Sequence, residues 1–164
     1  MNEAHFHLLV NHLPIIFPVV GVLVMVSGII YKSEAVKRTA YLIFAIGALT
    51  AIAAITSGEG AEEIAEKLNG VTENFIKNHE EAAETFAILS YILGGISIIG
   101  LWASVKQKPF STIIAFSALL FACVVLFFAK QTGTTGGEIR HTEIRSGNNV
   151  PAINNIVTEK DDSD

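Results

Sequence analysis

Histidines are the residues of this sequence best suited to chemistry, and they come from three separated segments. Three lie near the start of the chain, one lies in the middle, and one follows the last apolar stretch: His5, His7, His12, His79 and His141. Imidazole is a usual axial ligand of haem iron and the commonest side-chain ligand of transition metals. If the fold brings these segments together, the sequence predicts a cofactor or metal site.

Four charge-free stretches must position the histidines. The chain has 164 residues, of which 51% are hydrophobic and 16% are charged, whereas a soluble domain carries roughly a quarter charged residues. A membrane helix needs about 20 apolar residues, and four stretches without Asp, Glu, Lys or Arg come close to or exceed that length: Leu8–Ile30, Thr39–Ile55, Thr85–Ser104 and Phe110–Ala129. These continuous runs lack the alternation of an outer-membrane barrel. We therefore predict an all-α bundle of four transmembrane helices.

The expected domain covers residues 1–145. Its predicted spans are 8–31, 39–57, 82–104 and 110–130, with a helical loop over 58–81 and a flexible polar tail over 146–164. Within the loop, the apolar spacing of Ala61–Leu68 predicts a helical extension. Thr56–Gly60 is expected to loosen or end the second span, and the third begins either at Asn78, which resembles a helix cap, or earlier near Thr72.

The charges predict an orientation. Basic residues gather in two short loops, at Lys32, Lys37 and Arg38 and again at Lys106 and Lys108, and such loops stay in the cytoplasm. Every acidic residue except Glu34 lies on the other side with all the histidines. We expect that side, with both termini, to face the periplasm across a bacterial inner membrane. The net charge of −5 and the lack of a basic patch exclude nucleic acid as a partner.

The first span has an unusual start. His5 and His12 are seven residues apart, so one continuous helix places them on nearly the same face and turns His7 the other way. Pro14 can instead begin the regular helix and leave the preceding residues as a separate half-helix. In either case His12 lies at or below the membrane interface, where we expect it to have a partner in the bundle.

The fourth span ends in a segment rich in helix breakers, Gln131–Gly137. The glycine pair Gly136-Gly137 permits a sharp turn, which predicts that His141 folds back over the end of the bundle. Cys123 is the single cysteine and has no disulfide partner.

Three motifs of this sequence resemble those of a known protein family. His12-Leu13-Pro14-Ile15, His79-Glu80-Glu81-Ala82 and Gly136-Gly137-Glu138-Ile139-Arg140-His141 resemble an uncharacterised family of small bacterial four-helix integral membrane proteins, which is b-type cytochrome-like. The resemblance covers about residues 5–145. Such proteins are found beside or fused to respiratory redox modules, which implies an electron-transfer setting. The family often has an aromatic residue and a later histidine after its glycine pair, where this chain has His141 and Glu143.

Three functions remain open from the sequence. The first is a membrane electron-transfer subunit that binds haem b through His12 and His79, with His141 or His5 as substitutes; without Cys-x-x-Cys-His the haem is not covalently attached. The second is a transition metal ion held by His12, His79 and His141 with carboxylates from Glu80, Glu84, Glu138 or Glu143. The third is a cofactor-free accessory subunit of a membrane redox complex or a homo-oligomer in the lipid bilayer. The sequence contains neither a hydrolase pattern nor a phosphate-binding loop, and whether the chain is an enzyme stays open.

Overall fold

The structure is a computed structural model that describes residues 3–67 and 70–145, and these residues form helices and turns without a strand. The elements in chain order are α1 (Glu3–Val10), α2 (Leu13–Ile30), α3 (Glu34–Ala65), α4 (Glu73–Val105), α5 (Ser111–Arg140) and the short 3₁₀ helix η1 (Thr142–Ile144). The predicted all-α class is confirmed.

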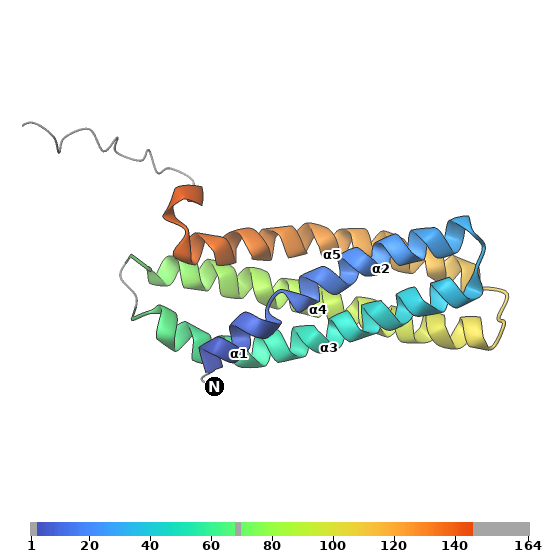
Figure 1. Cartoon of the computed structure of the whole chain (residues 1–164), viewed down its shortest axis with the longest axis horizontal. Coiled ribbons are helices and arrows are strands. Elements are labelled where there is room, and N and C mark those ends of the chain that lie inside the picture. The colour runs from blue at the N-terminus through green and yellow to red at the C-terminus, as the bar shows by residue number, and fades with distance from the viewer. Residues whose placement is uncertain (1–2, 68–69, 146–164) are drawn as a thin grey trace, which may run out of the picture.

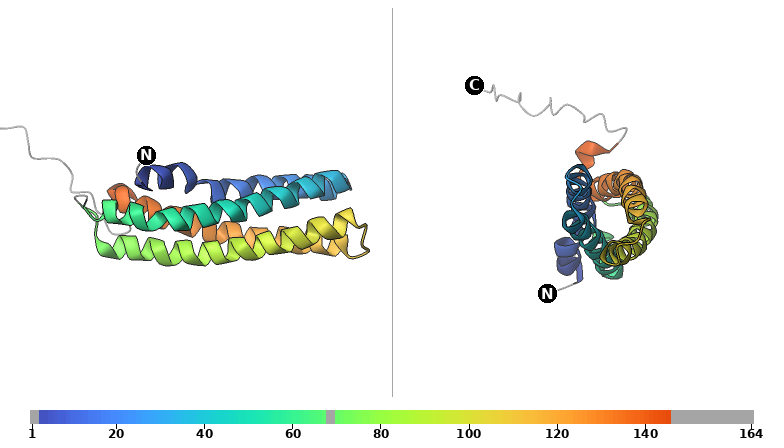
Figure 2. Two further views of the ribbon diagram at one scale, coloured as in Figure 1. Left: turned by 90° about the horizontal axis from the view of Figure 1, so that it is seen from below. Right: turned by 90° about the vertical axis from the view of Figure 1, so that its right-hand side faces the viewer.

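The four long helices run up and down and close into a bundle (Figure 1). Helix α2 packs against α3, α3 against α4 and α4 against α5, while contacts between α2 and α5 complete the ring that is visible down the long axis in Figure 2. Helix α1 packs against α3. We call the end that holds α1 and the carboxyl end of α5 the histidine end. The opposite end, with the turns after Ile30 and Val105, is the basic end.

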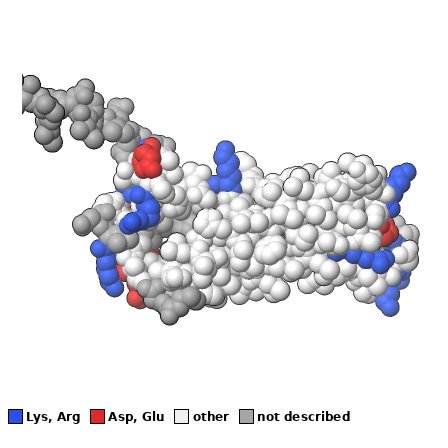
Figure 3. All heavy atoms as spheres, in the orientation of Figure 1, with Lys and Arg blue, Asp and Glu red and all other residues white. Residues whose placement is uncertain are grey.

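Four helical segments are long and apolar enough to cross a membrane: Ala4–Ile30, Glu34–Ala65, Glu73–Val105 and Ser111–Arg140. Large apolar side chains on all four point away from the bundle, among them Leu23, Leu49, Ile98 and Leu120. Figure 3 shows a broad band nearly free of charged side chains between two charged ends, with one basic side chain at its upper edge. By length and composition, the chain is a multi-pass membrane protein.

Small residues let the helices approach one another closely. A Cβ added to Gly94 of α4 would lie 2.6 Å from the Cβ of Ala48 on α3, and one added to Gly100 would overlap the ring of Tyr41. Helix α5 turns a row of fully or almost fully buried alanines inward: Ala115, Ala118, Ala122 and Ala129. In lipid, where apolar side chains gain nothing by leaving the solvent, close van der Waals packing over small residues is what holds helices together.

A network of charged and hydroxyl groups ties the basic end together. Ser104 of α4 donates a hydrogen bond to Glu34 over 2.7 Å and accepts one from Arg38 over 3.0 Å. Glu34 also pairs with Lys37, whose side chain is buried against Gly28 of α2. The buried ammonium group of Lys37 is thus paired with Glu34. These contacts join α2, α3 and α4.

The helix boundaries differ from the prediction at two places. The expected break at Thr56–Gly60 is wrong, because α3 continues through it to Ala65 and includes most of the predicted extension. The expected exit at Gln131–Gly137 is also wrong, because α5 remains helical to Arg140. A glycine inside a helix costs only about 1 kcal/mol, and packing against neighbouring helices outweighs that cost.

The other two boundaries follow alternatives that the sequence left open. Helix α4 begins at Glu73 after Thr72, not at Asn78. Helix α2 begins at Leu13 with Pro14 in its first turn, and two turn residues, Asn11 and His12, separate it from α1. The second of these boundaries decides where the first three histidines point. The predicted polar tail, 146–164, lies outside the described residues.

We predict that replacing Gly100 by alanine lowers the stability of the bundle by about 1–3 kcal/mol, because overpacking a filled core has that cost. The matched control is Gly95→Ala, five residues away on the same helix, where an added Cβ meets nothing within 4 Å. Thermal unfolding of both variants in detergent, followed by circular dichroism, measures the difference. Equal stability of the two variants would contradict the proposed packing of Tyr41 on Gly100.

Candidate functional site

The structure separates the histidines that the sequence grouped. His5, His12 and His141 are exposed, whereas His7 and His79 are partly buried at the histidine end. His12 caps the start of α2 through its backbone and makes no side-chain capping bond. Of the predicted ligands, only His79 therefore lies inside the bundle.

His7 anchors α1 to α3. Its Nδ1–H donates to the carbonyl oxygen of Ala54 over 3.1 Å and to the hydroxyl oxygen of Ser57 over 3.0 Å. A carbonyl oxygen can only accept, so Nδ1 carries the proton in this arrangement. In the neutral ring, Nε2 then keeps its lone pair.

His79 of α4 is held in a similar way by α5. Its Nδ1 lies 3.2 Å from Oγ1 of Thr135. The Thr135 hydroxyl donates its own hydrogen to backbone carbonyls one turn earlier in α5, so it accepts from His79. The imidazole fills the space beside Gly136, where an added Cβ would lie 2.9 Å from Cε1. Any larger residue at position 136 would displace the ring.

The two anchored rings lie at the same end of the bundle, His7 on α1 against α3 and His79 on α4 against α5. His79 and His7 are close enough for positive charges on the two to repel each other, and His12 acts on His7 in the same way. Asn11 follows His7 by four residues, and its Oδ1 is buried without a hydrogen-bond partner among the described residues. Residues four apart share a helix face. An unpaired polar atom and a ring nitrogen with a lone pair therefore lie on the same side of α1.

His7 escaped the sequence prediction because the face of a helix depends on where that helix ends. A single helix through residue 30 turns His7 away from His12, but the break at Asn11 and His12 makes α1 a separate element. The available signal was Pro14, which marks a helix start. It divides the segment, and the spacing of Ala4, His7 and Asn11 then defines the inner face of α1.

His141 does not return over the bundle. Helix α5 ends at Arg140, and the His141 ring pairs with Glu143 outside the bundle over 2.9 Å. A hydrogen bond from its own backbone N–H and the bond from His141 lower the pKa of the exposed Glu143 carboxyl. The predicted sharp turn at Gly136-Gly137 is wrong, since both glycines are helical and Gly136 serves to seat His79.

No group of three or more His, Cys, Asp or Glu side chains able to hold a metal ion occurs among residues 3–67 and 70–145. The described part of the chain therefore does not assemble His12, His79 and His141 as a ligand set. What it does bring together is a pair of imidazoles from α1 and α4, each fixed at Nδ1.

Comparison with protein-family models, with curated proteins and with solved structures finds no match for this chain. The family resemblance drawn from the histidine motifs thus stays a prediction.

We predict that His7→Ala loosens α1 from α3, because the side chain supplies a hydrogen bond worth about 1 kcal/mol. Amide hydrogen exchange in α1, measured by mass spectrometry in detergent, should become about two- to tenfold faster. Ser57→Ala should have a smaller effect, since the Ala54 carbonyl still accepts. The control is His12→Ala, whose exposed ring makes no bond to α3; unchanged exchange in His7→Ala would refute the anchoring role.

Proposed function

We propose that this chain is a membrane electron-transfer subunit that holds a b-type haem between His7 and His79. The observation that carries the proposal is the pair of half-buried imidazoles whose Nδ1 atoms are both bonded to the protein. Ligating histidines characteristically donate their second ring N–H to a carboxylate, a backbone carbonyl or water, which fixes the ring and directs the other nitrogen at the metal. Ala54 and Ser57 hold Nδ1 of His7, and Thr135 holds Nδ1 of His79.

The number of ligands favours haem over a bare metal ion. A transition metal ion bound by the protein alone requires three or four side-chain ligands, and the described residues offer no such group. Haem iron already has four porphyrin nitrogens and requires only two axial ligands. The proposal therefore takes His79 from the sequence prediction and puts His7 in the place of His12.

The surroundings of the two rings also fit this role. Glycines lie against both, with Gly58 of α3 beside His7 and Gly136 of α5 beside His79. The unpaired Oδ1 of Asn11 is one further polar contact on the His7 side. Haem bound there would supply one-electron exchange, while Ala54, Ser57 and Thr135 hold the imidazoles in position.

The location and partners belong to the same proposal. The concentration of Lys32, Lys37, Arg38, Lys106 and Lys108 at the basic end supports a cytoplasmic position for that end in a bacterial inner membrane. The histidine end then faces the periplasm, where a redox partner of a larger membrane complex or a second copy of the chain is expected to meet it.

The absorption spectrum of the full chain, purified in mild detergent with haemin supplied, tests the ligand assignment. We expect a Soret band and a sharp α-band on reduction, both lost or converted to a high-spin spectrum in His7→Ala and in His79→Ala. His12→Ala and His141→Ala are the controls, because their rings lie exposed, and both should keep the wild-type spectrum. Imidazole added to His7→Gly should restore the low-spin spectrum, which separates a lost ligand from a misfolded chain.

Two results overturn the haem proposal. One is the absence of a Soret band from the folded wild-type protein, with or without stoichiometric metal by elemental analysis. The other is a wild-type spectrum in both His7→Ala and His79→Ala.

Reporter fusions test the orientation separately. Alkaline phosphatase is active only outside the cytoplasm, so a fusion after Arg145 should be active and a fusion after Lys106 inactive. The reverse pattern in a bacterial host would refute the assignment of the histidine end to the periplasm while leaving the haem ligands unaffected.

A further inference from the structure

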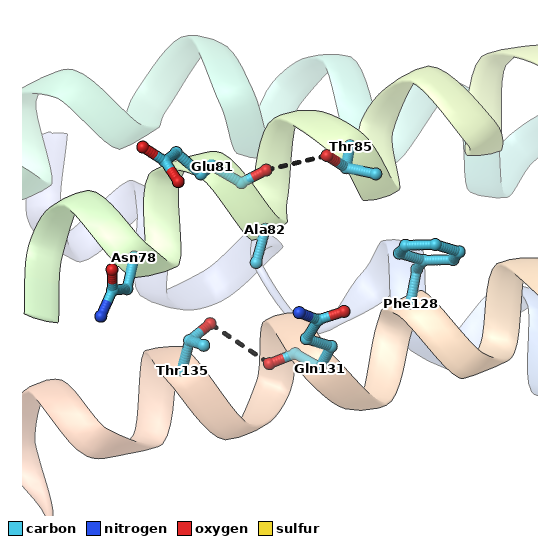
Figure 4. Close-up of a pocket in the computed structure, with 7 residues that line it drawn as sticks. All are labelled: Asn78, Glu81, Ala82, Thr85, Phe128, Gln131 and Thr135. Carbon is cyan, nitrogen blue, oxygen red and sulfur yellow. Dashed lines mark hydrogen bonds between the residues drawn. The ribbon is translucent and has the colours of Figure 1, made fainter.

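A polar groove runs between α4 and α5 and shares Thr135 with the surroundings of His79. Its volume is about 450 Å³, and it is formed by Asn78, Glu81 and Ala82 of α4 and by Phe128, Gln131 and Thr135 of α5. Figure 4 shows Asn78 and Ala82 directed toward the space between the helices, opposite Thr135 and Gln131. Thr135 belongs to both places, because it lines the groove and accepts the hydrogen bond of His79.

The groove lies at the boundary between the apolar and polar parts of the bundle. The charge-free stretch of α4 begins at Thr85 and that of α5 ends at Ala129, and Thr85 and Phe128 both line the groove. One end of the groove therefore meets the hydrocarbon side of the membrane and the other end meets the headgroup layer. A ligand that fits has a polar head and an apolar tail.

The lining specifies the chemistry of that head. Asn78 and Gln131 offer amide groups that donate and accept hydrogen bonds, and no Lys, Arg or His side chain lines the groove. Glu81 belongs to the rim, because Figure 4 shows its carboxylate directed away from α5. Among the described residues, the side chains of these three make no hydrogen bond with another residue. An anionic phosphate head would meet a carboxylate without a cation, so a neutral head that accepts and donates hydrogen bonds fits better. Phe128 adds an aromatic face, which favours a flat ring.

We propose that the groove binds a lipid-soluble quinone or quinol. The ring oxygens of such a molecule accept hydrogen bonds from Gln131 and Asn78, and a quinol hydroxyl donates to the amide oxygen of either residue. The ring lies against Phe128, and the apolar tail follows the lipid-facing side of the two helices. This binding site does not depend on the haem proposal, because occupancy is measured without any electron transfer.

Equilibrium binding of decylubiquinone to the full chain in phosphatidylcholine nanodiscs tests the proposal. We expect saturable binding with one site per chain. Ala82→Leu places a larger side chain in the groove and should weaken binding at least tenfold. Gln131→Leu and Asn78→Leu change exposed residues, so they leave the fold intact, and each should weaken binding about two- to tenfold by removing one hydrogen bond.

Further arms separate the ligand classes. The matched control is Lys130→Gln, which removes a cation next to Gln131 but outside the lining, and it should bind the quinone as the wild type does. No saturable binding, equal affinity in all three groove variants, or displacement of the quinone by phosphatidylglycerol in a Lys130-dependent manner would each overturn the assignment.

The two proposals fail in different ways. Loss of the Soret band with retained quinone binding removes the haem alone, and absence of quinone binding with a wild-type haem spectrum removes the groove assignment alone. A change in the His79 ring signals on adding decylubiquinone, observed by nuclear magnetic resonance with labelled histidine, would support the link through Thr135.

Discussion

Close approach of the helix backbones over small residues is the constraint on which the rest of this structure depends. Within a bilayer no water remains to pair backbone groups, so each segment must be helical, and the helices then associate by contact rather than by leaving the solvent. The contacts of Gly94 with Ala48 and of Gly100 with Tyr41 leave the middle of the bundle filled. The five histidines of the chain lie outside this filled middle, at one end of the bundle.

The two ends of the bundle differ in how their polar groups are paired. At the basic end, Glu34, Lys37, Arg38 and Ser104 satisfy one another and close the structure. At the histidine end, α1 leaves the line of α2 and lies against α3. The buried Oδ1 of Asn11 is left without a protein partner there, among the residues that the structure describes. The polar groups of the basic end are paired with one another, whereas Asn11 at the histidine end keeps an unpaired buried oxygen.

The coarse architecture could be predicted from the sequence, because a charge-free run of about 20 residues favours a membrane-spanning helix. The sequence also placed His79 at one end of the bundle, because His79 lies six residues before the charge-free run that begins at Thr85. The sequence did not predict that His7 faces the bundle, since the side that His7 faces depends on a two-residue break at Asn11 and His12. It also misplaced His141, because Gly136-Gly137 permits both a turn and a helix, and the choice between them is made by the imidazole that packs on Gly136. The local propensity of a residue for helix or turn does not predict such tertiary contacts.

Helices α3 and α4 are longer than the hydrocarbon layer is thick, and this excess length has an electrical consequence. At 1.5 Å per residue, the 32 residues of α3 and the 33 of α4 extend to about 48–50 Å, whereas the hydrocarbon layer is about 30 Å thick. The excess emerges at the histidine end, since the charge-free part of α4 begins only at Thr85. A transmembrane voltage acts on a charge in proportion to the fraction of the insulating layer that the charge crosses. Because His79 lies six residues outside the charge-free run that begins at Thr85, a charge that reached it from the adjacent aqueous phase would cross little of the insulating layer.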